Sequence, residues 1–511
     1  MMQSEIRATA GESKIVRVPS HVPGFDAILC GGFLQGGLYV VQGSPGAGKT
    51  LLASQILHGH AAAGGHGLFV TVLGESHGRM LLHLETMRFF DPSVIPDKVA
   101  YISAYQALDD EGLKGLSTLI RREVLARKTT LLVLDGMSTV ESRAESSFEM
   151  KRFTYEMQTL ASATDCTMFL LTTTEATSAP ERTMVDGLIE LRQQRQGPRN
   201  ERRVLVQKIR GTGFLEGEHA FHITRDGLTM FPRIEALFAS PTRLDPAPRA
   251  RLSSGVASLD AMFGGGLAAA TMTALVGPSG AGKTTLGLHF LSASNVAEPG
   301  LLFGCYESPE RLRLKAATMG FDFAAAEQRN EVALHWHPTG EYILDELAHR
   351  LLDAVRRRGV RRLVIDGVSG FQRAALEPER IVRFWSALSN ELRALGVTTL
   401  HTLEMPTLVG VDILPPGSEI SALAEAMVLL RYVELRSRLC RLISLSKVRE
   451  GAFDPTIREF SITDTGVVVG KPFEGVHAAP EQGDEEVAGH ARAASSGSGP
   501  SSSGGSTGQP R

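Results

Sequence analysis

Short apolar runs alternate with longer amphipathic segments along most of the chain, and this alternation occurs twice. In each half the apolar runs are separated by helix-length stretches, which is typical of a mostly parallel sheet flanked by helices. The matching runs are residues 38–41, 68–73 and 131–134 in the first half, and residues 273–276, 301–303 and 363–365 in the second. The pattern predicts an α/β fold whose site lies in loops at the carboxyl ends of the strands.

The pattern changes near the end of each half, where two strand-like runs flank a polar turn. Residues 187–191 and 204–207 form one pair, and residues 427–433 and 439–444 form the other. Each pair predicts an antiparallel hairpin. A Lys-x-Arg sequence stands where the second strand of each hairpin leaves the sheet.

The two halves share these elements in the same order at nearly constant spacing, which indicates tandem duplication of one domain. A chain of 511 residues is also too long for a single hydrophobic core. We expect an N-terminal extension at 1–17, a first domain at 18–240, a linker at 241–250 and a second domain at 251–472. The remainder, 473–511, is rich in Ser and Gly, and its composition predicts a disordered tail.

A glycine-rich loop follows the first apolar strand of each half and fits the pattern G-x-x-x-x-G-K-[ST]. Such glycines let consecutive N–H groups surround a phosphate at a helix N-terminus, and the lysine reaches the β- and γ-phosphates. The first loop and the residue after it are Gly43, Ser44, Pro45, Gly46, Ala47, Gly48, Lys49, Thr50 and Leu51. The second set is Gly277, Pro278, Ser279, Gly280, Ala281, Gly282, Lys283, Thr284 and Thr285. Two loops in the same strand–loop–helix context predict that the chain binds nucleoside triphosphate twice.

The same positions predict a metal ion beside each nucleotide. The hydroxyl groups of Thr50 and Thr284 are expected to ligate Mg²⁺. Asp135 and Asp366 end the later apolar strand of each half, where a carboxylate can hold the Mg²⁺ shell. We therefore expect ATP and Mg²⁺ as the ligands of both sites.

Another strand of each half is predicted to end in a glutamate, Glu75 in the first half and Glu307 in the second. At the end of a strand beside the loop strand, a carboxylate can orient or deprotonate the attacking water. Alternatively, Glu307 is an acid at the start of a helix, because Ser308 and Pro309 after it suit a helix N-terminus. We favour the catalytic interpretation.

Four cations belong to the Lys-x-Arg sequences: Lys208 and Arg210 in the first half, and Lys447 and Arg449 in the second. They are remote in sequence from the loops of their own halves. Cations at such strand ends can stabilise transition-state charge on a neighbouring subunit's phosphate. The alternative is a solvated strand end, and the recurrence in both halves favours the catalytic role.

Composition narrows the classes of partner. The formal net charge is −3, which gives no global electrostatic reason to expect nucleic acid. The basic stretch at 356–362 suits a solvated helix end. Four scattered cysteines, the lack of a signal-like N-terminus and the lack of a run near the ~20 apolar residues of a membrane span predict a cytoplasmic protein away from membranes.

With tandem loops, Asp-ended strands and Lys-x-Arg hairpins, the chain resembles the KaiC-like family of circadian-clock ATPases in the RecA-like superfamily. The likeness runs from about residue 19 to residue 465 and is most specific at 208–212, 216–223 and 432–434. It implies two RecA-like domains and a double-ring homohexamer with ATP between subunits, where the neighbour supplies Lys-x-Arg. It also implies slow hydrolysis in the first ring, Ser/Thr autophosphorylation in the second, and signalling protein partners.

The chain departs from the family pattern at two places. The family carries two adjacent glutamates after the strand, the first being its catalytic base, whereas this chain has Gly74-Glu75 and Tyr306-Glu307. The family's adjacent Ser-Thr acceptors match Ser421-Ala422, which leaves Ser421 as the candidate phosphosite.

The expected function is that of a homohexameric regulatory ATPase with serine autokinase activity in its second domain. The runner-up is a RecA-like recombination or DNA-repair ATPase, which the slightly acidic composition disfavours. A nucleotide-gated scaffold with little turnover is the third possibility, because the first glutamate is missing from both halves.

Overall fold

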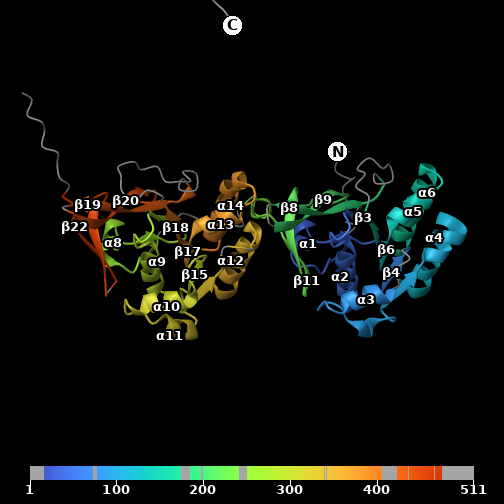
Figure 1. Ribbon diagram of the computed structural model, residues 1–511, viewed down its shortest axis with the longest axis horizontal. Helices are drawn as coiled ribbons and strands as arrows, with labels where there is room; N and C mark the ends of the chain where they lie inside the picture. Colours follow the sequence, from blue (N-terminus) through green and yellow to red (C-terminus); the bar gives the residue numbers. More distant parts are fainter. Residues whose placement is uncertain are drawn as a thin grey trace, which may run out of the picture. The chain divides into compact units, whose positions relative to one another are not determined.

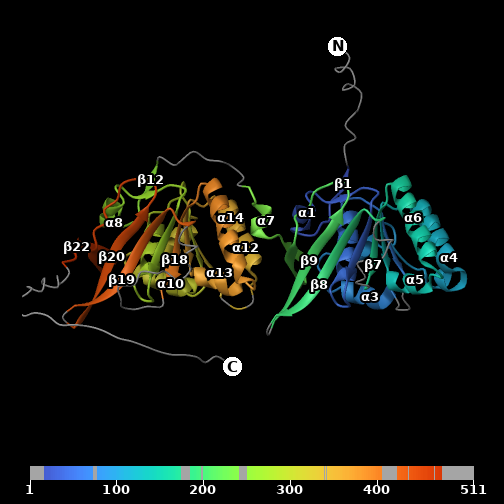
Figure 2. The same cartoon turned by 90° about the horizontal axis from the view of Figure 1, so that it is seen from above.

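The computed structural model describes residues 16–72, 77–173, 184–196, 199–240, 250–338, 340, 342–405, 423–435, 437–464 and 466–474. These residues form two large sheets, each of nine strands and each flanked by helices (Figures 1 and 2). The prediction of two tandem RecA-like α/β domains is confirmed. No helix among these residues is long and apolar enough to cross a membrane.

The first sheet is parallel where it carries the glycine-rich loop and antiparallel beyond it. Its order is β11-β10-β9-β8-β3-β7-β6-β4-β5, with β8 parallel to β3 and antiparallel to β9. Its strands are β3 (Leu38–Gly43), β4 (Gly67–Thr71), β5 (Val99–Ser103), β6 (Leu131–Asp135), β7 (Thr167–Thr172), β8 (Gly187–Gln196), β9 (Arg199–Ile209), β10 (Glu218–Thr224) and β11 (Gly227–Phe231).

The second sheet repeats this arrangement, with β14 taking the place of β3 and β19 that of β8. Its order is β16-β15-β17-β18-β14-β19-β20-β21-β22. Its strands are β14 (Met272–Gly277), β15 (Gly300–Gly304), β16 (Val332–Trp336), β17 (Arg362–Asp366), β18 (Thr398–Glu404), β19 (Ala426–Leu435), β20 (Arg438–Val448), β21 (Arg458–Thr463) and β22 (Gly466–Pro472). Two short antiparallel pairs precede the large sheets: β1 (Arg17–Val18) with β2 (Phe33–Leu34), and β12 (Arg251–Leu252) with β13 (Leu267–Ala268).

Helices cover both faces of each sheet, because the strand residues that point to either face are apolar. In β3, Tyr39 and Val41 pack with α1 and α2, whereas Leu38 and Val40 pack with α4, α5 and α6. The first-half helices are α1 (Phe25–Ile28), α2 (Lys49–Ala62), α3 (His77–Leu84), η1 (Pro92–Val94), α4 (Tyr105–Arg127), α5 (Met137–Arg143) and α6 (Ser147–Thr164). The later ones are α7 (Ile234–Leu237), α8 (Ala257–Met262), α9 (Lys283–Ser292), α10 (Pro309–Ala317), α11 (Phe323–Gln328), α12 (Leu344–Arg358), α13 (Val368–Ala374), η3 (Pro378–Arg380) and α14 (Ile381–Ala394).

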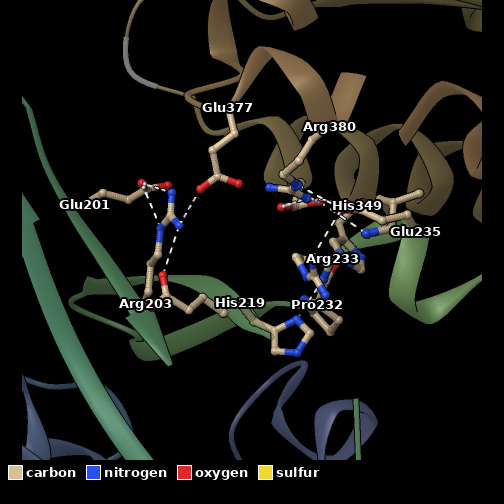
Figure 3. A network of polar contacts seen from close by, with 12 residues as sticks. Glu201, Arg203, His219, Pro232, Arg233, Glu235, His349, Glu377 and Arg380 are labelled. Carbon is tan, nitrogen blue, oxygen red and sulfur yellow. Dashed lines mark hydrogen bonds and ion pairs between the residues drawn. The ribbon is translucent and has the colours of Figure 1, made fainter. Parts of the chain in front are cut away.

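The short helix α7 comes from the range assigned to the first domain, yet it packs into the core of the second. Ile234 and Phe238 are buried in the cluster formed by α12, α13 and α14. Polar contacts fix the same segment (Figure 3): the Arg380 guanidinium donates to Glu235 at 2.8 Å, and His349 Nε2 donates to the Pro232 carbonyl oxygen at 2.8 Å. The chain is therefore anchored on the second domain before it reaches the predicted linker.

A second contact between the domains involves the sheet that carries the first Lys-x-Arg. Arg203 of β9 donates to Glu377, just before η3, at 2.7 Å, and also to Glu201 and Glu218 (Figure 3). Arg203 is mostly buried, with 11 % of its side chain exposed, and three carboxylates compensate its positive charge. Burial of an arginine is stable only when its charge is compensated in this way.

Two strands end earlier than the sequence pattern predicted. β4 ends at Thr71 and β15 at Gly304, whereas the predicted strands extended to Glu75 and Glu307. In the second half the residues after Gly304 lead to α10, which begins at Pro309, a residue that suits the first position of a helix. Glu75, Ser421, most of the linker and nearly all of the tail lie outside the described residues.

Candidate nucleotide-binding sites

Both glycine-rich loops lead directly into a helix, and their lysines fold back over the loop. Lys49 Nζ donates to the carbonyl oxygens of Gly43 at 2.7 Å and Ser44 at 3.0 Å. Lys283 Nζ donates to the carbonyl oxygens of Gly277 and Pro278, both at 2.7 Å. Burial lowers the pKa of both lysines. A phosphate placed in either loop would therefore meet an ammonium group held at the loop itself.

The last glycine of each loop is required by the backbone. Gly48 and Gly282 have φ values of 105° and 106°, which favour glycine. A Cβ atom at Gly48 would lie 2.9 Å from Ile223 Cδ1, and one at Gly282 would lie 3.1 Å from Ile462 Cδ1. These turns begin α2 and α9, so the free N–H groups of each first helical turn are directed at the loop.

A threonine and an aspartate meet beside each lysine. Thr50 Oγ1 donates to Asp135 Oδ2 at 2.8 Å, and Thr284 Oγ1 donates to Asp366 Oδ2 at 2.8 Å. The two aspartates end β6 and β17, which are far along the chain from the loops. Strand pairing in each sheet therefore places the aspartate beside the threonine of the loop. Hydroxyl and carboxylate oxygens are the hard ligands that Mg²⁺ takes, and this donor set therefore fits the ion.

The second loop opens into a cavity of about 530 Å³. Tyr306 and Glu307, which the sequence comparison aligned with the family's adjacent glutamates, both line it. Tyr306 Oη is hydrogen-bonded to Ser369 Oγ at 2.7 Å, and Glu307 lies 3.5 Å from Lys315 Nζ of α10. Glu307 thus lines the cavity and also directly precedes Ser308, the N-cap residue of α10, so its position does not decide between a catalytic acid and an acid at a helix start.

The Lys-x-Arg cations lie at the opposite end of the sheet from their own loops. Lys208 pairs with Leu188 of β8, which pairs with Val40 near the start of β3, whereas the loop follows Gly43 at the end of β3. That register separates Lys208 from its own loop by roughly 10 Å along the strands and roughly 10 Å across them.

The second domain repeats this register. Lys447 pairs with Met427, which pairs with Ala274 of β14. Arg210 and Arg449 directly follow β9 and β20. The structure brings loop, threonine and aspartate together in each domain, and it leaves the four cations apart from them.

Two residues that the sequence did not single out make hydrogen bonds to the metal-binding aspartate and to the loop of the second site. Thr402 Oγ1 donates to Asp366 Oδ1 at 2.8 Å and accepts the Gly367 N–H at 2.8 Å. The Tyr432 hydroxyl donates to the Gly280 carbonyl oxygen of the loop at 2.7 Å. Tyr432 was noted only as part of a family-specific sequence, and the sole signal for Thr402 was its place near the end of an apolar run.

A family model for the KaiC ATPase matches residues 18–235 and 252–474, that is, both domains. The chain belongs to the KaiC ATPase family. Each match contains one loop and its partner aspartate, so membership covers both sites. KaiC membership supports ATPase chemistry in general.

The curated relatives match along nearly their whole length. The circadian clock oscillator protein KaiC of Rippkaea orientalis is 27% identical over 472 residues, covering 89% of each chain. That of Thermostichus vulcanus is 27% identical over 482 residues, covering 91% of each chain. That of Synechococcus elongatus is 26% identical over 468 residues, covering 88% of each chain.

Proposed function

We propose that this chain is a regulatory ATPase that binds one Mg·ATP at each loop and hydrolyses it slowly. The observation that carries the proposal is the duplicated contact of loop, lysine, threonine and aspartate at two helix N-termini. These are the parts that P-loop ATPases use to hold a triphosphate and its metal ion. Family membership supports the same chemistry at both places.

The lysines and the loop amides do the binding in this proposal. Lys49 and Lys283 exchange their loop carbonyl partners for β- and γ-phosphate oxygens when ATP enters. Thr50 with Asp135, and Thr284 with Asp366, would hold Mg²⁺, which neutralises charge on the phosphates when bound.

Glu75 and Glu307 are proposed to orient the attacking water, as the acids nearest the family's catalytic pair. For Glu307 the support is its place in the cavity wall. For Glu75 the support is sequence alone.

The Lys-x-Arg cations are proposed to complete the site of a neighbouring subunit in a homohexamer. Their support is the strand register, which keeps Lys208, Arg210, Lys447 and Arg449 away from their own loops. An arginine supplied in trans stabilises the charge that develops during phosphoryl transfer. ATP would then control assembly, because each nucleotide is shared by two subunits.

We place this switch in the cytoplasm with signalling proteins as partners, following the clock oscillator proteins that it resembles. Departures at Tyr306 and Ala422 separate it from the family pattern of those proteins, so the rhythm itself is not part of the proposal. A scaffold with little turnover remains the competing function, because Tyr306 occupies the place of the family's base.

Steady-state ATP turnover of the full chain, alone and with Lys49→Ala or Lys283→Ala, tests the proposal. We expect slow turnover in the wild type and a partial loss in each variant. Binding of two nucleotides without measurable turnover would favour the scaffold. Salt-dependent binding of single-stranded DNA would favour the recombinase, because phosphate contacts release counterions.

We further propose conditional autophosphorylation at Ser421, which matches the family's acceptor position and lies outside the described residues. Phosphoryl transfer depends mainly on positioning and charge neutralisation, for which Thr284, Asp366, Lys447 and Arg449 are available. Incubation with labelled ATP followed by phosphosite mapping should place label on Ser421. Label that persists undiminished in Ser421→Ala would discard this site.

A further inference from the structure

A carboxylate that the sequence analysis did not single out lines the second nucleotide site. Glu404 is the last residue of β18, directly beside the start of the loop, because Glu404 pairs with Gly277 in the parallel ladder. The Met405 N–H donates to the Gly277 carbonyl oxygen at 3.1 Å and locks this register. Since side chains alternate along a strand, Glu404 lies on the same face of the sheet as Thr402, whose hydroxyl group donates a hydrogen bond to Asp366.

The Glu404 side chain lines the cavity together with Lys283, and it is exposed to it. Burial lowers the pKa of Lys283, and the negative charges of Glu404 and Asp366 partly oppose this by raising it. Lys283 is the residue expected to contact the β- and γ-phosphates, so the carboxylate of Glu404 lies in the wall of the cavity that would receive them.

The other acidic side chains of the cavity, and its tyrosine, are engaged. Both carboxylate oxygens of Asp366 accept threonine hydroxyls, and Glu307 faces the Lys315 ammonium. The Tyr306 hydroxyl is bonded to Ser369, and a neutral phenol accepts a proton less readily than a carboxylate. Among the residues that the structure describes, no hydrogen bond or ion pair engages the carboxylate of Glu404.

The first site has a different arrangement at the equivalent positions. Ladder register places Thr173 where the second site has Glu404, since Gln42 pairs with Thr172. Ser138 Oγ is hydrogen-bonded to Thr173 Oγ1 at 2.7 Å, whereas its counterpart Ser369 is bonded to Tyr306. Both sites therefore lack the family's first glutamate, but only the second has a carboxylate at the end of the strand beside its loop strand, β18 beside β14.

We infer that Glu404 is the catalytic base of the second site, taking the role left open by Tyr306. Glu404 accepts a proton from the attacking water as the water oxygen forms a bond to the γ-phosphorus. The bond from that phosphorus to the bridging oxygen breaks, and ADP leaves with the electron pair. This inference rests on the proposed ATPase function of the second loop.

The test uses the full chain carrying Lys49→Ala, so that only the second site turns over. Glu404→Gln should lower kcat by ~10²-fold or more with KM within ~3-fold, because general-base help is typically worth ~10²–10⁴-fold. Glu404→Thr, which copies the first site, should have the same effect. Glu310→Gln, an exposed acid on α10 outside the cavity lining, is the matched control and should leave kcat unchanged.

Binding of a fluorescent ATP analogue to each variant separates the two levels of the proposal. Failure of the Lys49→Ala chain to bind the analogue would overturn the proposed function of the second loop. Normal binding with no turnover would overturn the proposed ATPase function of the second site. Turnover that is insensitive to Glu404→Gln would overturn the role of Glu404 alone. Tighter binding with undiminished kcat in Glu404→Gln would show that the carboxylate only repels the triphosphate.

Discussion

The two candidate sites of this chain share their phosphate-binding parts and differ in the residues around them. Lysine, loop and threonine–aspartate contact are the same within a few tenths of an ångström. On the next strand, however, the first site has buried Leu171 beside Asp135, and the second has Thr402 bonded to Asp366. Burial raises the pKa of Asp135, with the Thr50 hydrogen bond opposing it.

The loop contacts differ as well. Tyr432 holds the carbonyl oxygen of Gly280 in the second loop. At the equivalent register the first domain has Gln193, an exposed residue of β8. A duplicated domain can therefore keep the loop that binds a triphosphate while other groups diverge. The groups that differ here are those that hydrogen-bond to the metal-binding aspartate and the candidate base that would accept the proton of water.

The largest expected effect concerns the cations that would serve a neighbour. We expect Arg210→Ala to lower ATP turnover of the first ring by ~10³-fold, measured in a chain whose second loop is disabled by Lys283→Ala. Arg449→Ala should lower turnover of the second ring equally, measured in a chain whose first loop is disabled by Lys49→Ala. The reason is that an arginine supplied in trans is worth ~10³–10⁵ in kcat. Light scattering should show a hexamer with ATP in the parent chain. A chain that stays monomeric with ATP at micromolar concentration would refute the shared site.

A pH effect on the stability of the second domain should follow from one buried histidine. His401 lies fully buried in β18, where the first sheet has Leu170, and burial lowers its pKa to about 4. The native state therefore prefers the neutral ring, so this stability is complete above about 6.5, the ordinary histidine value, and is lost as pH falls towards 4. The loss should approach ~3 kcal/mol.

Both tryptophans, Trp336 and Trp385, belong to the second domain, and Trp385 stacks on His401 with 6.0 Å between ring centroids. Denaturant titrations followed by tryptophan fluorescence thus report that domain. His401→Leu should flatten the acid limb. An acid limb unchanged in His401→Leu would assign the effect to other groups.

The threonine that supports Asp366 should matter more than a neighbouring one. Thr402→Val removes the partner of Asp366 Oδ1 and of the Gly367 N–H, and should cost ~1–3 kcal/mol in the free energy of unfolding of the second domain. Thr399→Val is the control, because the buried Thr399 Oγ1 has no hydrogen-bond partner among the described residues. Equal effects of the two variants would contradict the role given to Thr402.

The smallest effect is expected at the loop contact found in the second site. Tyr432→Phe removes one hydrogen bond to Gly280, worth ~0.5–1.5 kcal/mol, and should weaken ATP binding at the second loop by ~2- to 10-fold. Titration of the Lys49→Ala chain with a fluorescent ATP analogue measures it. Unchanged affinity would show that the loop keeps its shape without Tyr432.

The α/β fold and the two loops were predictable because their signals are local. A G-x-x-x-x-G-K-[ST] sequence between an apolar strand and a helix needs no information from elsewhere in the chain. Thr402 and Glu404 could not be found in this way, because their neighbours, Asp366 and Gly277, are set by strand register between distant segments. Alternation along a single strand does not specify which strand pairs with it.

Two other features depended on tertiary contacts. The basic stretch at 356–362 was predicted to be solvated, but Arg362 is buried, bonded to Glu298 and placed over the Phe290 ring. Helix α7 was assigned to the first domain by its position before the linker, whereas packing of Ile234 places it in the second. In both cases the partner that decides burial lies far away in sequence.

Equilibrium binding of ATP with Mg²⁺ measures whether one chain holds two working triphosphate sites. We expect two nucleotides per wild-type chain at saturation, and one in each of Lys49→Ala and Lys283→Ala. A stoichiometry of one in the wild type would contradict this expectation.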